Sequence, residues 1–159
     1  MSDSTTLLNQ FDRKLIDSLY VEAMVLADEA RSFFDHRAEE HRALLAQIDR
    51  VEFACESLKV TTRLMHVIAW LLTQRAILNG ELPESVRGEE RHRLGDAAVT
   101  APGIGDRFSF DMKTLIEASE DLYDRVARLE SQLLGRSRGT RLVPLNPARD
   151  LLTRLERAF

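Results

Sequence analysis

VEFACESLKVTTRLMHVIAWLLTQRAILNG, residues 51–80, decides the fold because this stretch is apolar on more than one side of a helix. Small and apolar residues recur in alternating steps of four and three, a spacing that places them on one helical face. From Leu64 onward a second apolar row joins the first, with Val67 and Trp70 between the two rows. The first row consists of Leu44, Ile48, Val51, Cys55, Leu58, Thr62, Met65, Ala69, Leu72 and Ala76, and the second of Leu64, Ile68, Leu71 and Leu78.

A helix with two apolar rows needs two partner surfaces. A membrane span is excluded as the explanation, because a bilayer needs roughly 20 consecutive apolar residues, whereas this run holds His66 and is flanked by Arg63 and Arg75. A helix over residues 38–79 would be about 60 Å long, longer than a compact domain of this size requires. We therefore expect part of it to pack against a second copy. The residues expected in the core or the dimer interface are Leu64, Met65, Ile68, Trp70, Leu71 and Leu72.

Composition sets the broad class of the protein. A chain of 159 residues with 44% hydrophobic and 30% charged residues is typical of one globular domain. The formal charge of -4 gives no electrostatic attraction toward nucleic acid or an anionic membrane surface. The N-terminus has no cationic start followed by an apolar run, so we expect no secretory signal and a cytoplasmic location.

The rest of the chain predicts an all-α fold, a three-helix bundle of long antiparallel helices with a short C-terminal helix, in one domain spanning residues 1–159. Residues 1–6 are expected to fray, with N-caps at Ser4 to Thr6, before an amphipathic first helix. The corner to the second helix falls within residues 35–43. Gly80 ends that second helix, and a long loop follows over 81–107, with one short helix near 84–94.

The third helix begins near Ser109 and is expected to end at Gly135, before a flexible link over 136–146. Asn146 and Pro147 then indicate the start of a short helix. Because such a short helix is marginal alone in water, its apolar side must dock on something. A helix that caps its own bundle is the favoured interpretation, and a partner-binding face is the alternative. That face consists of Leu151, Leu152, Leu155 and Phe159.

No pattern of residues indicates catalysis, a metal or a cofactor. His36 and Glu40 stand four apart on a charged corner with His41, but no Glu-x-x-His pair repeats on two helices, and a solvated corner is the favoured interpretation. His66 lies among apolar residues, where a neutral, hydrogen-bonded histidine is expected. Cys55 lies on the apolar row, so we expect a buried, inert thiol. The sequence therefore predicts a protein that is not an enzyme.

Residues 19–31, LYVEAMVLADEAR, and 56–82, ESLKVTTRLMHVIAWLLTQRAILNGEL, resemble the alphaproteobacterial RcdA family, regulator of CtrA degradation. The second motif sets polar residues in an apolar frame. The resemblance implies a three-helix bundle that forms homodimers and acts as a non-catalytic adaptor, helping to deliver cell-cycle transcription factors to the ClpXP unfoldase-protease with accessory adaptors. The polar residues of the motif are Lys59, Thr61, Thr62, Arg63, His66 and Gln74.

A second function remains open: a helical, homodimeric regulator associated with transcription that contacts DNA or polymerase. The acidic charge balance argues against direct contact with nucleic acid. An adaptor in regulated proteolysis is the preferred hypothesis, with protein partners only.

Overall fold

The structure is a computed structural model that describes residues 2–141. Within that range the chain forms four α helices, three short 3-10 helices and no strand, so the all-α prediction is confirmed. The expected C-terminal helix, with Leu151, Leu152, Leu155 and Phe159, lies outside the described residues. The helices are α1 (Ser2–His36), α2 (Ala38–Ala43), α3 (Gln47–Leu78), η1 (Glu84–Gly88), η2 (Glu90–His92), η3 (Ile104–Arg107) and α4 (Phe110–Arg141).

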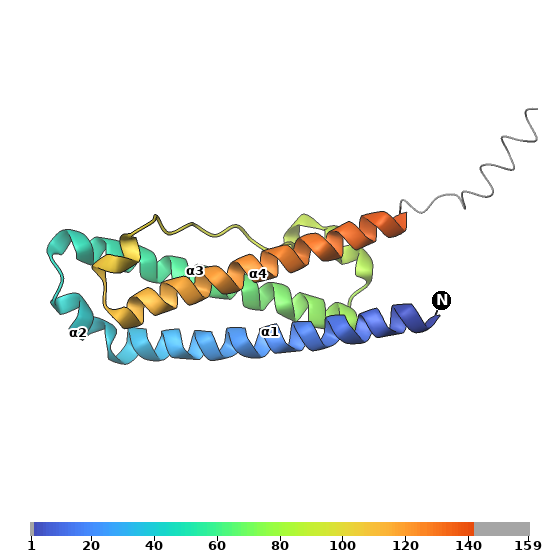
Figure 1. Cartoon of the computed structure of the whole chain (residues 1–159), viewed down its shortest axis with the longest axis horizontal. Coiled ribbons are helices and arrows are strands. Elements are labelled where there is room, and N and C mark those ends of the chain that lie inside the picture. The colour runs from blue at the N-terminus through green and yellow to red at the C-terminus, as the bar shows by residue number, and fades with distance from the viewer. Residues whose placement is uncertain (1, 142–159) are drawn as a thin grey trace, which may run out of the picture.

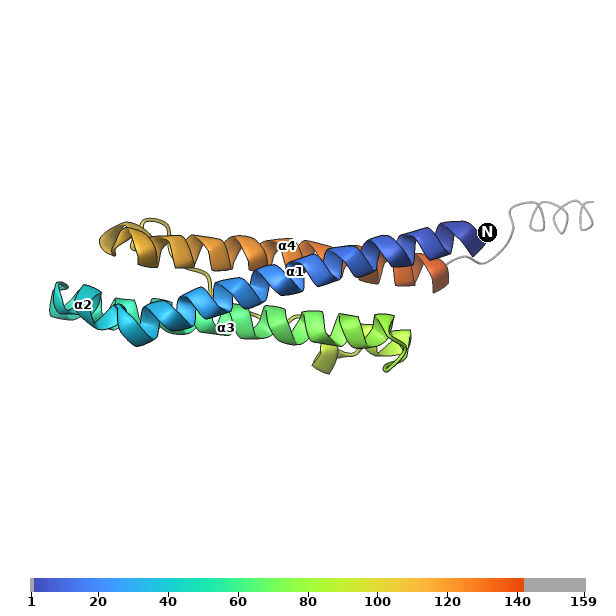
Figure 2. The ribbon, with the colours of Figure 1, turned by 90° about the horizontal axis from the view of Figure 1, so that it is seen from below.

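Three long helices, α1, α3 and α4, run side by side as an elongated bundle (Figure 1). Seen from below, α1 crosses the pair formed by α3 and α4 at an angle (Figure 2). Residues 81–107, which we call the strap, run along the side of the α3 and α4 pair that faces away from α1 (Figure 1). The molecule therefore has three layers: α1, then α3 with α4, then the strap.

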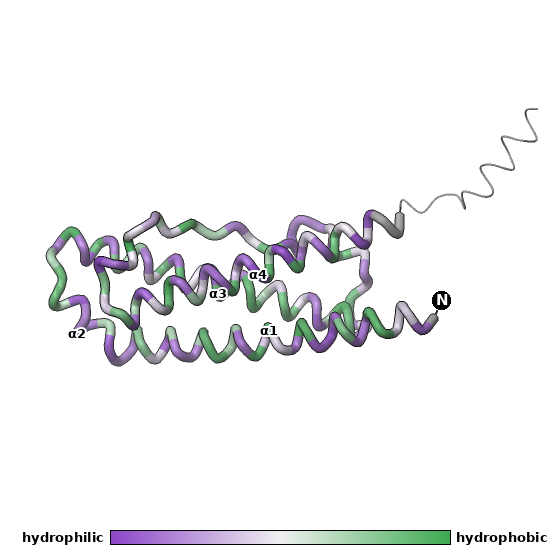
Figure 3. Tube along the Cα trace, viewed as in Figure 1, coloured by the Kyte–Doolittle hydropathy of each residue, from purple (hydrophilic) through white to green (hydrophobic). Residues whose placement is uncertain are grey.

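Apolar and polar residues alternate along the three long helices (Figure 3), and the apolar ones converge on one core. α1 contributes a row at steps of three and four, as the sequence predicts for an amphipathic helix. Burying such a side chain stabilises the fold by about 1.5–3 kcal/mol. The fully buried apolar side chains at the centre are Ile16, Ala23, Phe33, Val60, Val67, Leu71, Met112, Ile116, Leu122 and Val126.

The helix boundaries differ from the expected ones at both ends of the described chain. α1 begins at Ser2, ahead of the expected caps, and Asp3 lies in its first turn, where a carboxylate favours the helix N-terminus. α4 continues past Gly135 to Arg141. A glycine inside a helix costs only about 1 kcal/mol, and Arg136 beyond it bonds to Asp12 of α1 at 3.0 Å.

The corner and the strap also contain structure that the sequence pattern does not resolve. The short helix α2 occupies much of the expected corner, and Arg50 closes the turn by donating to the carbonyl oxygens of Leu45 and Ala43. The helix expected near 84–94 is two separate 3-10 helices, η1 and η2. Glu89 between them is extended, which interrupts a continuous helix.

Candidate interaction surface

The strap is fastened to one row of polar residues on α3, and this row belongs to the polar motif within residues 56–82. Lys59 donates from Nζ to the Val99 carbonyl oxygen at 3.3 Å, and Arg63 donates from Nη2 to the Ala98 carbonyl oxygen at 2.9 Å. Further along the same row, the Gln74 side-chain oxygen accepts from Arg87 Nε at 2.9 Å. These polar residues therefore have a structural role. Lys59 and Arg63 supply hydrogen bonds that the extended backbone of the strap cannot make to itself, and Gln74 holds the strap through the Arg87 side chain.

Glu56, Arg63 and Thr100 form a buried charged cluster where the strap meets α3. Arg63 is 2% exposed and Glu56 is 3% exposed. The Thr100 hydroxyl accepts from Arg63 Nη2 at 2.8 Å and donates to Glu56 Oε2 at 2.5 Å. Lys59 Nζ lies 2.7 Å from the other Glu56 oxygen, and Arg63 Nη1 donates to Ser119 of α4 at 3.2 Å. Glu56 is paired with Lys59, and the Arg63 guanidinium is hydrogen-bonded to neutral oxygens, so neither buried charge lacks partners.

The middle of the strap is held by α4. The Tyr123 hydroxyl donates to the Gly95 carbonyl oxygen at 2.7 Å, and the Leu94 amide donates to Glu130 at 2.6 Å. Partial burial raises the pKa of Tyr123, and the charge of Asp96 adds to the effect. The neutral phenol, which the hydrogen bond to Gly95 uses, is therefore the favoured form over a wide pH range.

His66 packs its ring against the strap, whereas the sequence predicts a hydrogen-bonded histidine. Its Nδ1 is buried and, among the described residues, has no hydrogen-bond partner. A Cβ added at Gly95 would lie 2.6 Å from the His66 ring, so only glycine allows the strap to pass this closely. Nδ1 therefore makes no hydrogen bond of the expected kind, because this side of the ring packs against Gly95.

The opposite side of α3 is exposed and carries no charge over more than two-thirds of the helix. From Val51 to Leu78 every exposed residue is apolar, small or a threonine. Leu58 and Met65 are 68% and 64% exposed. We call this set the α3 outer face, and it spans about 30 Å at 1.5 Å per residue. It consists of Val51, Ala54, Cys55, Leu58, Thr61, Met65, Ala69 and Leu72.

The charged residues of this part of α3 are turned away from the outer face and are paired within the bundle. Glu52 bonds to Arg107 of the strap at 2.6 Å. Arg75 lies 3.3 Å from Asp17 of α1 and stacks on the Tyr20 ring at 4.5 Å. A contiguous apolar surface bordered by satisfied polar groups is typical of a protein interaction site.

The residues expected in the core or the dimer interface divide between these two sides of α3. Leu64, Trp70 and Leu71 are buried in the bundle and Ile68 is half-buried, whereas Met65 and Leu72 lie on the outer face. The expectation of a buried Cys55 is wrong, because Cys55 is exposed on the outer face, opposite the core. The first apolar row therefore points outward and the second points inward.

The charged corner does not assemble a larger set of ligands. His36 ends α1, and His41, in α2, packs its ring against Phe33 at 5.2 Å. Nowhere in residues 2–141 do three or more His, Cys, Asp or Glu side chains gather as they would around a metal ion. In the same part of the chain, no helix combines the length and apolar character that crossing a membrane requires.

Comparison with known proteins identifies a family and a similar solved structure. Residues 8–159 match the family described as "Protein of unknown function (DUF1465)". The crystal structure of RcdA from Caulobacter crescentus CB15 is 32% identical, with a TM-score of 0.61, and the match covers 75% of this chain and 90% of that chain. No curated protein sequence matches the chain.

Proposed function

Because the chain belongs to the RcdA-like family of DUF1465 proteins, we propose that it is a non-catalytic adaptor in regulated proteolysis. In this role it acts in the cytoplasm and helps deliver cell-cycle transcription factors to ClpXP, together with accessory adaptors. The observation that carries the proposal is the α3 outer face, a long exposed helix surface without charge. An adaptor works through surfaces of this kind and needs no reactive site.

We further propose that the working form is a homodimer paired through the α3 outer face. Its most exposed large residues recur at steps of seven, Val51, Leu58, Met65 and Leu72, a repeat that lets two helices pack side by side. Two such faces related by a twofold axis present the same residues to each other, as an isologous interface requires. A charged partner surface would find no charge on this face to pair with.

A reconstituted degradation assay tests the adaptor role. Purified ClpXP, a cell-cycle transcription factor and the accessory adaptors are mixed with or without this protein, and the disappearance of the factor is followed in time. The proposal predicts faster degradation when the protein is present, and a matched reaction without ATP excludes losses unrelated to the protease. An unchanged degradation rate with all accessory proteins present would contradict the adaptor role.

A further inference from the structure

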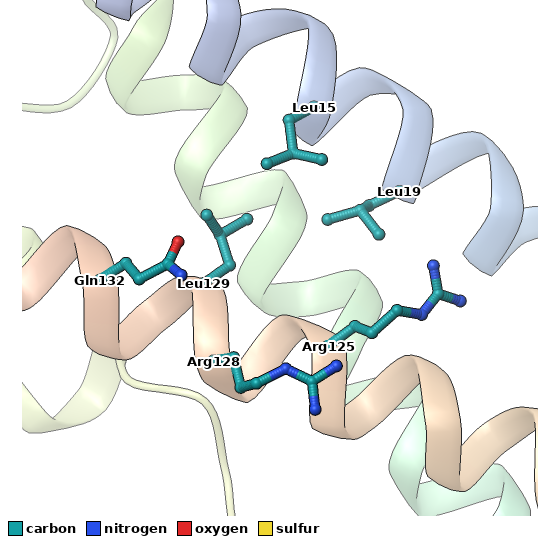
Figure 4. A pocket seen from close by; sticks show the side chains of 6 residues that line it. All are labelled: Leu15, Leu19, Arg125, Arg128, Leu129 and Gln132. Carbon is teal, nitrogen blue, oxygen red and sulfur yellow. The ribbon is translucent and has the colours of Figure 1, made fainter.

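A second surface lies between α1 and α4. Leu15 and Leu19 point from α1 toward Leu129 on α4, and Arg125, Arg128 and Gln132 complete the walls of a shallow hollow of about 190 Å³ (Figure 4). Such a hollow is smaller than a typical small-molecule pocket of roughly 300–1,000 Å³. It is suited to one apolar side chain rather than a whole ligand.

Another hollow, of about 310 Å³ and so at the lower limit of that range, lies further along the same two helices. Its apolar lining comes from Val25, Leu26 and Ala118, and Glu22, Glu29 and Asp121 complete it. Leu19 of the first hollow and Leu26 of the second are seven residues apart in α1, which is roughly 11 Å. This is the spacing of two apolar side chains on one face of a helix.

Arg125 separates the two hollows. Its guanidinium bonds to both carboxylate oxygens of Glu22 across the gap and to Asp121 on its own helix at 2.9 Å. These bonds raise the pKa of Arg125, the hydrogen bond to Glu22 most of all. Its charge is thus neutralised. Arg125 therefore links α1 to α4 and is not available to pair with an acidic side chain of a partner.

Two charged residues that line the hollows, Arg128 and Glu29, are not neutralised in this way. Among the described residues, Arg128 beside the first hollow and Glu29 beside the second take part in no ion pair. Glu29 lies ten positions beyond Leu19 in α1, roughly 15 Å along the helix axis. We call the two hollows together the groove: it has an apolar part on each side of the Arg125–Glu22 ion pair, a positive end at Arg128 and a negative end at Glu29.

We propose that this groove, formed by α1 and α4, docks an amphipathic helix of a partner protein, with an acidic side chain at Arg128 and a basic side chain about three turns later at Glu29. The partner helix places two apolar side chains, seven residues apart, in the two hollows. It runs parallel to α1, since acidic residues favour the N-terminal end of a helix and basic residues the C-terminal end. The inference deepens the adaptor role and rests on it, because it assigns a surface for gripping a partner that is separate from the α3 outer face.

The test uses a designed, helix-stapled peptide of about 15 residues with this pattern, and a control peptide in which the acidic and basic residues are exchanged. Fluorescence anisotropy with the full chain measures both affinities. We expect the first peptide to bind more tightly, and Arg128→Glu or Glu29→Lys to weaken it by about threefold to tenfold. Both substitutions change exposed side chains, so the fold is retained. The double variant should prefer the control peptide.

Equal binding of the two peptides, or unchanged preference in the double variant, would overturn the proposal. Two other results would also overturn the proposal. Tighter peptide binding after Leu152→Asp and Leu155→Asp would assign the groove to the C-terminal segment of the chain. A change of molecular mass in Arg128→Glu would assign the groove to a second copy. The anisotropy assay contains no protease, so it can fail while the degradation assay succeeds. If the peptide binds as expected but the degradation rate is unchanged, the adaptor role is contradicted and the assignment of the groove is retained.

Discussion

Arg63 of α3 and Thr100 of the strap, 37 positions apart in the chain, are joined by a buried hydrogen bond of 2.8 Å. The same Thr100 hydroxyl reaches Glu56, so one side chain of the strap is bonded to two oppositely charged residues of α3. The strap is thus part of the folded core rather than a loose connection. Glu56 and Arg63, which hold the strap, are buried on the side of α3 opposite the outer face, and the outer face itself carries no charge.

Replacing Arg63 should therefore lower the free energy of unfolding strongly. Arg63→Met keeps much of the side-chain volume but leaves the Ala98 carbonyl and the hydroxyls of Thr100 and Ser119 without their donor, and each buried polar group left unpaired costs about 1–3 kcal/mol in the free energy of unfolding. Thr100→Val removes the hydroxyl alone and should cost about 1–3 kcal/mol. Urea unfolding followed by circular dichroism measures both. A loss for Arg63→Met below that for Thr100→Val would contradict the assigned role of the cluster.

Gly95 and His66 give a second test of how the strap is held. Gly95→Ala places a methyl group 2.6 Å from the His66 ring, so the strap must shift, and we expect destabilisation of about 1–3 kcal/mol. Gly88, with nothing near its missing Cβ, provides a matched control for Gly88→Ala. Removing the ring in the double variant Gly95→Ala, His66→Ala should restore part of the loss relative to His66→Ala alone. Equal melting temperatures of Gly95→Ala and Gly88→Ala would rule out the close contact.

Much of this architecture is predictable from the sequence, because periodicity reports which residues share a helical face. The rows of α1, α3 and α4 and the stop at Gly80 follow from spacing and local chemistry. Periodicity does not report which of two apolar rows points inward, and for this reason the expected burial of Cys55 is wrong. The direction of α3 depends on where Glu56 and Arg63 find partners, and Thr100 and Ser119 are too distant in sequence to be recognised as those partners.

Glu120 gives a pH-dependent prediction. Partial burial raises its pKa, outweighing the attraction of Arg63, and the charges of Asp124, Glu56 and Glu117 act in the same direction as burial. A carboxyl group whose pKa is raised on folding contributes stability below its unfolded pKa, and that contribution is lost as the pH rises through the folded value. Glu120→Gln should therefore raise the melting temperature at pH 7, by an amount worth less than about 1 kcal/mol because water screens the site.

Thermal melts of the wild type and Glu120→Gln across the acid range check this sign. The advantage of the variant over the wild type comes from removing the ionised carboxylate, so it should shrink as the pH falls toward about 4.3. Glu29→Gln, at an exposed position whose charge is not among those that act on Glu120, serves as a control. An advantage that grows on acidification would mean that the carboxylate is stabilised, not destabilised, in the folded protein.

Ligand additions test the proposed absence of a small-molecule site. Because neither the sequence nor the described residues assemble a ligand set, we expect the melting temperature to stay constant when divalent metals, a chelator or inorganic phosphate are added. A ligand that binds only the folded state at 100 times its Kd would add about 2.7 kcal/mol. A rise of several degrees with a metal would reopen His36, Glu40 and His41 as a site.

A charged substitution should unfold the bundle in the buried row of α3 and should affect only association in the exposed row. Leu71 is fully buried, so Leu71→Glu should unfold the bundle. Met65 is 64% exposed, so Met65→Glu should leave the fold intact and act only on association. Val21 of α1, 61% exposed and outside the α3 outer face, supplies the matched control Val21→Glu. Circular dichroism separates loss of fold from loss of association.

The most direct measurement is the molecular mass of the wild type and of Met65→Glu by sedimentation equilibrium at micromolar concentration. Pairing through the α3 outer face predicts the mass of two chains for the wild type and for Val21→Glu, and the mass of one folded chain for Met65→Glu. A wild-type mass of one chain, or a Met65→Glu variant that stays paired, would contradict the assignment of this face as the interface between two copies.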